Sequence, residues 1–323
     1  MDPRLLTAIV VVVGVPATVI GYIIVIEQLL RLAPNVWRPR LRPWLWLLPA
    51  LLFLTVFLVY PTINTVILSF QDKFSRNFVG LLNYQYFFTT SDTLIALRNN
   101  AIWLVLLTLF AVGGGLIVAI LFDRVRYESI AKSVVFLPLA ISFVGASVIW
   151  NFMYAYKTPG EPQTGTLNAV VTSVGFDPIA WLQETPLNTI MLIIVAAWIW
   201  TGFCMVILSA ALKGISAELL EAARVDGATE VEVFRHITFP LLLPTVAVVS
   251  TTMIITALKA FDIVYVMTNG NFDTEVIANR MYKELFAFSQ PGRASAVAVI
   301  LLILIVPVMI INIRRFREQE ALR

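Results

Sequence analysis

The chain has 323 residues, of which 59% are hydrophobic and only 13% are charged, and its mean hydropathy is +0.86. A soluble domain is nearer to half apolar and a quarter charged, so this composition excludes a single water-soluble domain and predicts a protein that has lipid as its solvent. The net charge of +3 does not indicate a nucleic-acid-binding protein, because the basic residues gather at the ends of apolar runs.

Seven apolar runs are each long enough to cross a bilayer, which takes about 20 residues of helix. They lie near residues 5–29, 44–70, 99–122, 133–154, 188–212, 238–258 and 294–313. The first run could instead be a cleavable signal peptide, but its apolar part is too long and Arg4 is the only basic residue before it, so we interpret it as a span. Internal prolines do not argue against the spans, because neighbouring membrane helices re-satisfy the freed carbonyls. The sequence therefore predicts an all-α integral membrane protein with about seven transmembrane helices.

The basic residues predict how the spans are oriented, because short cytoplasmic loops carry an excess of Lys and Arg. Three segments are rich in them, with Arg31, Arg38, Arg40 and Arg42 in the first, Arg124, Arg126 and Lys132 in the second, and Arg314, Arg315, Arg317 and Arg323 in the C-terminal tail. Placing these segments in the cytoplasm puts the loops near 71–98, 155–187 and 259–293 outside. The C-terminus is then predicted to be cytoplasmic and the N-terminus external.

The most charged stretch of the chain, EAARVDGATEVEVFRHITFP at 221–240, connects two apolar runs. Ser216 as an N-cap and Glu218 in the first turn predict that a helix begins just before this stretch. Gly227 stands where that helix should end, since glycine can take the positive φ that turns the chain. A second amphipathic segment follows and ends at Pro240. The sequence predicts a short helical hairpin that fits a groove of a partner protein, with an interfacial loop that has no partner as the alternative.

This stretch resembles the EAA loop in the permease subunits of binding-protein-dependent ATP-binding-cassette (ABC) importers. Phe239 is a departure, because the family pattern has leucine there. The segments at 47–70, 78–88 and 261–286 also look like carbohydrate permeases of the maltose importer type, in particular the first permease subunit of alpha-glucoside and glucosylglycerol importers. The resemblance predicts an extra N-terminal helix with a basic linker at 1–43 and a permease core at 44–323.

The resemblance implies the role of the EAA loop, which is to dock as a coupling helix in a cleft of an ATPase subunit. Glu221 would pair with a basic group of that cleft. The coupling residues that the resemblance implies are Glu221, Ala222, Ala223, Asp226, Gly227, Ile237 and Pro240.

The resemblance also implies a permease subunit of the bacterial or archaeal cytoplasmic membrane that translocates an alpha-glucoside-type sugar or osmolyte, such as trehalose, sucrose, maltose or glucosylglycerol. Its expected partners are a second homologous permease, two ATPase subunits, an external solute-binding protein, the sugar and the lipid bilayer, with no nucleic acid. ATP and Mg²⁺ are expected on the ATPase subunits, and no cofactor, metal or catalytic residue is expected on this chain.

The sugar path is predicted from two segments that resemble the sugar-contacting helices of the maltose permease, at 196–205 and 256–267. Aromatic rings and a few polar partners suit the apolar faces and hydroxyl groups of sugars. The predicted path residues are Trp198, Trp200, Phe203, Thr256, Lys259 and Asp262. Trp198 and Trp200 cannot face the same way on one helix. Lys259 and Asp262, three residues apart, have a simpler interpretation as an ion pair near the external interface. The sequence departs from the family at Ala196, Ala257, Lys259 and Ala260, where asparagines are replaced.

The sequence offers little that indicates catalysis or nucleotide binding. It contains neither GxxxxGK[ST] nor a GxGxxG in a strand–helix setting, and the triple glycine at 113–115 is better explained by close helix packing. The single histidine, His236, lies in the predicted hairpin. A self-sufficient secondary carrier or channel remains the alternative function, although such carriers usually keep ionisable residues in mid-membrane, and here Glu27, Lys259 and Asp262 lie near span ends.

Overall fold

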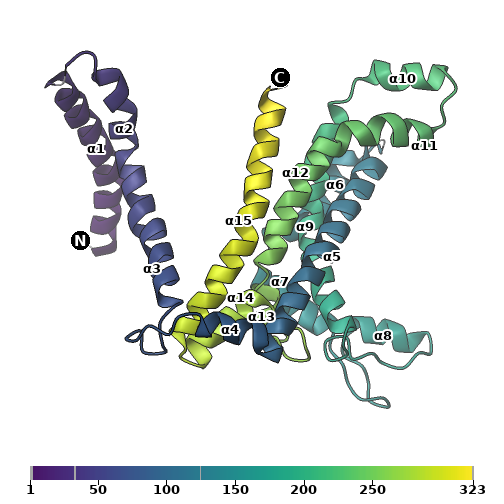
Figure 1. Cartoon of the computed structure of the whole chain (residues 1–323). Coiled ribbons are helices and arrows are strands. Elements are labelled where there is room, and N and C mark those ends of the chain that lie inside the picture. Colours follow the sequence, from purple (N-terminus) through teal and green to yellow (C-terminus); the bar gives the residue numbers. More distant parts are fainter. Residues whose placement is uncertain (1–2, 33, 124, 322–323) are drawn as a thin grey trace. The chain divides into compact units, whose positions relative to one another are not determined.

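The structure is a computed structural model that describes residues 3–32, 34–123 and 125–321 (Figure 1). Within these ranges the regular elements are all helices, so the predicted all-α fold class is confirmed. The chain divides into two compact units, Met1–Thr65 and Val66–Arg323. The division into residues 1–43 and 44–323 made from the sequence stays a prediction.

The number of membrane spans agrees with the prediction of about seven. Within the described residues, six helices are long and apolar enough to cross a membrane, and a bent pair raises the count to seven. The six are Val10–Leu32, Arg38–Leu68, Ser91–Phe122, Leu187–Lys213, Glu230–Leu258 and Pro291–Arg314.

The fourth predicted span, near residues 133–154, consists of two helices with a sharp bend between them. Helix α6 (Glu128–Phe136) passes through a 3₁₀ turn and is followed by α7 (Phe143–Met153), with a bend of 101° between the two parts. Pro138 lies in the 3₁₀ turn, where its lack of an N–H removes one helical hydrogen bond. Ser142 has extended backbone angles, and its side chain accepts a hydrogen bond from the Gly145 N–H at 3.0 Å. The N-cap at Ser142 begins a new helix after the turn, so local sequence stabilises the break between α6 and α7.

The first unit contains α1 (Pro3–Leu32), α2 (Arg38–Leu54) and the first part of α3 (Tyr60–Leu68), and a π-helical turn at Thr55–Val59 connects α2 to α3. An ion pair of 2.8 Å between Arg42 and Glu27 joins α1 to α2, and the Tyr22 hydroxyl donates a hydrogen bond to the Leu45 carbonyl. These two contacts hold the helical hairpin together at its charged end.

The centre of the second unit is the contact between α5 (Ser91–Phe122) and α9 (Leu187–Lys213). Glycines bring the backbones close, since a Cβ atom added at Gly115 would lie 2.6 Å from Cys204 Cβ. On the other side of α9, a Cβ at Gly202 would lie 2.5 Å from the Val135 carbonyl oxygen of α6. The predicted packing role of the triple glycine is confirmed for Gly115, whereas a Cβ at Gly113 would meet nothing within 4 Å.

The two ends of the second unit carry different structures. Figure 1 shows α4 (Leu82–Thr89), α8 (Thr166–Ser173), α13 (Asp262–Met267) and α14 (Ile277–Tyr282) at one end, and α10 (Ala217–Val225), α11 (Glu230–Val233) and the C-terminal end of α15 (Pro291–Ala321) at the other. The three loops predicted to be external thus share one end of the unit. Which end faces the cytoplasm stays a prediction. Arg124 and Arg323 lie outside the described residues, as do the side chains of Arg315 and Arg317.

A buried charge cluster ties helices together at the end that carries α4 and α14. The Arg280 guanidinium, 7% exposed, pairs with the fully buried Glu284 at 2.8 Å and with Asp92 of α5 at 2.9 Å. It also donates a hydrogen bond of 2.5 Å to the Tyr86 hydroxyl of α4. Because buried charges are costly without partners, this cluster holds three separate segments in one arrangement.

Candidate functional site

The predicted hairpin is present, and its turn has a defined backbone structure. Helix α10 ends with a Schellman motif, in which the Ala228 N–H bonds to the Ala223 carbonyl at 3.0 Å and the Gly227 N–H bonds to the Arg224 carbonyl at 3.1 Å. Gly227 has φ of +87°, the left-handed conformation that the sequence predicts for it. Ser216 is the N-cap residue, although its side chain makes no capping hydrogen bond.

Side-chain contacts join the two arms of the hairpin. Arg224 of α10 forms two hydrogen bonds with the Glu230 carboxylate of α11, at 2.7 and 3.4 Å. The hydrogen bond to the Glu230 carboxylate raises the pKa of the Arg224 guanidinium. A capping box between Thr229 and Glu232 begins α11, with the Thr229 N–H bonded to the Glu232 carboxylate at 2.8 Å.

The predicted coupling residues lie along this hairpin and its return into α12 (Phe239–Leu258). Glu221, Ala222, Asp226, Gly227 and Pro240 are exposed, and Ala223 and Ile237 are half-buried. Two apolar side chains near the tip, Val225 and Val231, are 86% and 74% exposed. An exposed tip that combines carboxylates with apolar side chains has the chemistry of a docking surface.

The base of the hairpin is held by an ion-pair cluster that the sequence analysis did not identify. The Glu128 carboxylate of α6 pairs with Lys213, the last residue of α9, at 2.6 Å and with Lys132 at 2.5 Å. Lys132 also donates a hydrogen bond to Ser209 of α9. The spacing of Glu128 and Lys132 by four residues is a signal that could have revealed their pairing. The cluster joins α6 to the end of α9 at Lys213, four residues before α10 begins at Ala217.

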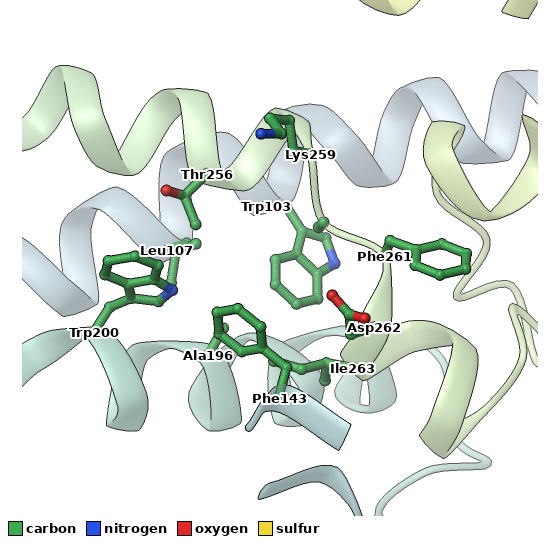
Figure 2. Close-up of a pocket in the computed structure, with 11 residues that line it drawn as sticks. Trp103, Leu107, Phe143, Ala196, Trp200, Thr256, Lys259, Phe261, Asp262 and Ile263 are labelled. Carbon is green, nitrogen blue, oxygen red and sulfur yellow. The ribbon is translucent and has the colours of Figure 1, made fainter. Parts of the chain in front are cut away.

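A cavity lies between α5, α7, α9 and the break that follows α12 (Figure 2). Its volume is about 370 Å³ when space open to solvent is included, but the centres of water-sized molecules can occupy only about 60 Å³. The smaller value describes the room available to a ligand, because the larger one counts open space. Ligand pockets usually measure about 300–1,000 Å³, so the cavity in this arrangement of the helices is smaller than a typical ligand pocket.

Four of the six predicted path residues meet in this cavity. Trp200 of α9, Thr256 of α12 and the pair Lys259 and Asp262 line its wall. Trp198 does not line the cavity and instead packs its ring against Trp150, with ring centroids 5.6 Å apart. The prediction that the two tryptophans face different ways is therefore confirmed.

The sixth predicted path residue, Phe203, lies behind the cavity wall. It contacts the Trp200 ring edge-on at 5.5 Å and does not line the cavity itself. Of the predicted set, the structure therefore brings together one aromatic ring, one hydroxyl group and two charged groups.

The predicted ion pair between Lys259 and Asp262 is wrong. Both side chains are among the described residues, and no ion pair or hydrogen bond joins them there. The spacing of three residues brings side chains together only within one helix. Here α12 ends at Leu258 and α13 begins at Asp262, so the chain turns between the two. Both charges instead line the cavity.

The sequence analysis missed three aromatic residues of the cavity, Trp103 of α5, Phe143 of α7 and Phe261. Trp103 is 2% exposed, and its buried indole nitrogen has no hydrogen-bond partner among the described residues. Figure 2 shows this nitrogen turned towards the Asp262 carboxylate. Hydropathy could not identify these residues, because aromatic side chains count as apolar wherever they point.

The break after α12 is stabilised by Asn100 of α5. Its side-chain amide donates to the carbonyls of Ala257 and Leu258 at 3.4 and 3.2 Å, and its oxygen accepts from the Ile277 N–H at 2.8 Å. A buried asparagine in an apolar run is a signal that could have predicted a nearby break, since it satisfies backbone groups that a helix leaves unpaired. Among the residues that the structure describes, no group of three or more His, Cys, Asp or Glu could hold a metal ion.

Residues 111–314 match the model of a protein family described as the binding-protein-dependent transport system inner membrane component. This segment covers more than half of the chain and contains both the hairpin and most of the cavity. The chain belongs to this family. It is a multi-pass permease component of an ABC transport system in the inner membrane.

Two curated relatives extend the match over most of the permease. The osmoprotective compounds uptake permease protein GgtC of Synechocystis sp. is 60% identical over 279 residues, which cover 86% of this chain and 100% of the relative. The alpha-glucoside transport system permease protein AglF of Rhizobium meliloti is 46% identical over 281 residues, which cover 87% and 84% of the two chains.

A solved structure supports the fold of the permease. A crystal structure of a bacterial ABC transporter involved in the import of alginate matches with a TM-score of 0.74 over 87% of this chain and 99% of that chain. The sequence identity is 23%, so this likeness bears on the fold alone.

Proposed function

We propose that this permease translocates an alpha-glucoside-type sugar or a related osmolyte, such as trehalose, sucrose, maltose or glucosylglycerol, in an ATP-driven importer. The observation that carries the proposal is the 60% identity to a permease for osmoprotective compounds over that protein's whole length, supported by the 46% identity to an alpha-glucoside permease. The chemistry of the cavity agrees with a neutral polyol. The rings of Trp200 and Phe143 offer apolar faces, and Lys259 and Asp262 carry opposite charges that can each bond hydroxyl groups.

The proposed partners are a second permease subunit, two ATPase subunits that bind ATP and Mg²⁺, and an external solute-binding protein. This chain supplies the path and no catalytic residue, and ATP hydrolysis takes place on the ATPase subunits. The exposed hairpin α10–α11 docks in a cleft of one ATPase subunit, with Glu221 facing a basic group there. The hairpin end of the second unit and the C-terminus are then cytoplasmic, and the N-terminus is external.

The connection between hairpin and cavity supports a coupling role. The chain enters the hairpin from α9 and leaves it into α12, and the same two helices carry Trp200 and Thr256 to the cavity. The Arg224–Glu230 pair joins the two arms of the hairpin, so movement of the ATPase subunits passes to both helices. Closure of the ATPase dimer on ATP tilts α9 and α12 and widens the cavity for the sugar, and hydrolysis resets it.

The test compares two glycines that have the same positive φ but lie in different loops, so that valine is strained equally at both positions. Gly227 and Gly175 have φ of +87° and +88°, and a Cβ at either would meet nothing within 4 Å. We expect Gly227→Val to reduce sugar uptake in reconstituted vesicles by about tenfold or more, because the strained turn shifts the hairpin. Gly175→Val, in the loop after α8, should leave uptake nearly unchanged. Equal uptake by both variants would contradict the coupling role.

The second test identifies the partners and the cargo. The permease is purified in mild detergent from its native membrane, and ATP hydrolysis is measured with the solute-binding protein and each candidate sugar. We expect an ATPase subunit to co-purify with the wild type but not with Glu221→Lys, while Glu161→Lys, an exposed glutamate of another loop, serves as the charge control. A chain that purifies without an ATPase would instead support a self-sufficient carrier.

A further inference from the structure

The α1–α2 hairpin of the first unit contains an apolar groove that the proposed transport cycle does not use. It runs along residues 18–26 of α1 and 46–53 of α2, and the centres of water-sized molecules can occupy about 490 Å³ of it. Eight residues of helix rise about 12 Å, which is most of the about 15 Å that one leaflet contributes to the hydrocarbon core. The groove has the length of an acyl-chain segment in one leaflet.

The few polar groups of the groove are already bonded within the hairpin. The Thr18 hydroxyl donates to the Gly14 carbonyl at 2.7 Å, and the Tyr22 hydroxyl donates to the Leu45 carbonyl. The remaining lining side chains are apolar, including Ile26 and Phe53. The groove therefore offers hydrocarbon surface and little to hydrogen-bond, which suits an acyl chain better than a polar ligand.

A cluster of positive charge lies directly beyond one end of the groove. Residues 27–42 contain four arginines and one glutamate, which gives a net charge of 4 − 1 = +3. Helical rise places Arg31 about 7.5 Å beyond Ile26 and Arg42 about 6 Å before Trp46 along their helices. Trp46 is 48% exposed and stands at the rim, where tryptophan commonly marks the membrane interface.

Two of these arginines are available to an added anion. Arg42 is paired with Glu27 at 2.8 Å. The side chains of Arg31 and Arg40 are exposed and have no ion pair or hydrogen bond among the described residues. Arginine forks bind phosphate oxygens strongly, and basic clusters next to membrane helices attract anionic lipids.

We propose that the α1–α2 hairpin is a binding site for an anionic phospholipid, with the phosphate headgroup at Arg31 and Arg40 and one acyl chain in the groove. The arginines lie where the headgroup of such a lipid would be, at the membrane interface, and the groove lies where its acyl chain would be, in the hydrocarbon below. The charge selects an anionic headgroup, and the groove retains the lipid during detergent extraction. The site is independent of the proposed sugar transport.

The headgroup part is tested by native mass spectrometry of the full-length permease with its co-purifying subunits. The delipidated protein is titrated with phosphatidylglycerol or phosphatidylcholine that carry identical acyl chains. We expect the wild type to prefer phosphatidylglycerol, and the double variant Arg31→Gln/Arg40→Gln to lose about tenfold or more of that preference. The control Arg76→Gln/Lys157→Gln removes two exposed charges from other loops and should keep it. A wild type without headgroup preference, or equal losses in both double variants, would overturn the proposal.

The groove is tested separately with a pair of tryptophan substitutions in α2. Ala50→Trp fills the groove and should reduce retention of both lipids, whereas Leu48→Trp, which does not line the groove, should retain them. Equal lipid retention by the two variants would overturn the acyl-chain site. If Ala50→Trp instead released a protein subunit and left the lipids bound, the groove would be a protein interface, and the proposal would be wrong.

Discussion

The segment Arg38–Leu68 and the helix α9 (Leu187–Lys213) are both apolar enough to span a membrane, yet they have opposite surroundings. In the most apolar 18-residue window of α9, 50% of the residues are buried within the chain, and in Arg38–Leu68 the share is 0%. Lipid is as apolar as leucine, so apolar character does not drive one helix against another. Small residues do allow close contact, and α9 has Gly202 and Ser209 where Arg38–Leu68 has no glycine. Helix packing here follows side-chain size more than hydropathy.

The largest expected effect on stability comes from breaking a buried ion pair in the second unit, compared with an exposed ion pair in the first. Arg280→Met leaves Glu284 buried without its cation, and we expect a loss of about 3–5 kcal/mol in the free energy of unfolding. Arg42→Met in the first unit removes the partner of Glu27, which is 32% exposed, and should cost under about 1 kcal/mol. Thermal unfolding in detergent measures both variants. Similar losses would show that the two ion pairs are equally exposed in the protein.

A pair of leucine truncations tests the comparison directly. Leu208 of α9 is 0% exposed, and Leu208→Ala should cost about 2–5 kcal/mol, because it removes buried contacts and leaves a cavity. Leu58, between α2 and α3, is 62% exposed, and Leu58→Ala should change stability much less, because lipid can fill the space. The same unfolding measurement applies. A large effect of Leu58→Ala would indicate that another protein surface covers this segment.

The smallest expected effect separates two faces of one helix. Gly115→Ala places a methyl group 2.6 Å from Cys204 Cβ and 2.8 Å from the Met205 nitrogen, so α5 and α9 must separate, at a cost of about 1–3 kcal/mol. Gly113→Ala meets nothing within 4 Å and should be neutral or slightly stabilising, since alanine favours helix. Equal unfolding midpoints for the two variants would argue against the close contact.

Much of the helical layout was predictable because length and apolar character are local properties. Six of the seven predicted runs coincide with long helices, and Gly227 has the positive φ that its position suggested. The span predicted near 133–154 corresponds to the bent pair of helices, and hydropathy did not reveal how sharp the bend of 101° is. The pairing of Lys259 with Asp262 was mispredicted because it assumed an unbroken helix.

The amino-acid order alone determined that the protein lives in a membrane, how many spans it has and where its charged hairpin turns, since each follows from residues within about one helix length. Only the tertiary structure decided which apolar side chains face a cavity. Trp103, Phe143 and Trp200 come from three helices far apart in the chain, and they meet because Gly115 and Gly202 let α5, α6 and α9 approach closely and because Asn100 holds the end of α12 open. The physical reason is that an apolar side chain gains little free energy when it moves from lipid into contact with another helix. Close packing and buried hydrogen bonds therefore select among the arrangements that hydropathy allows.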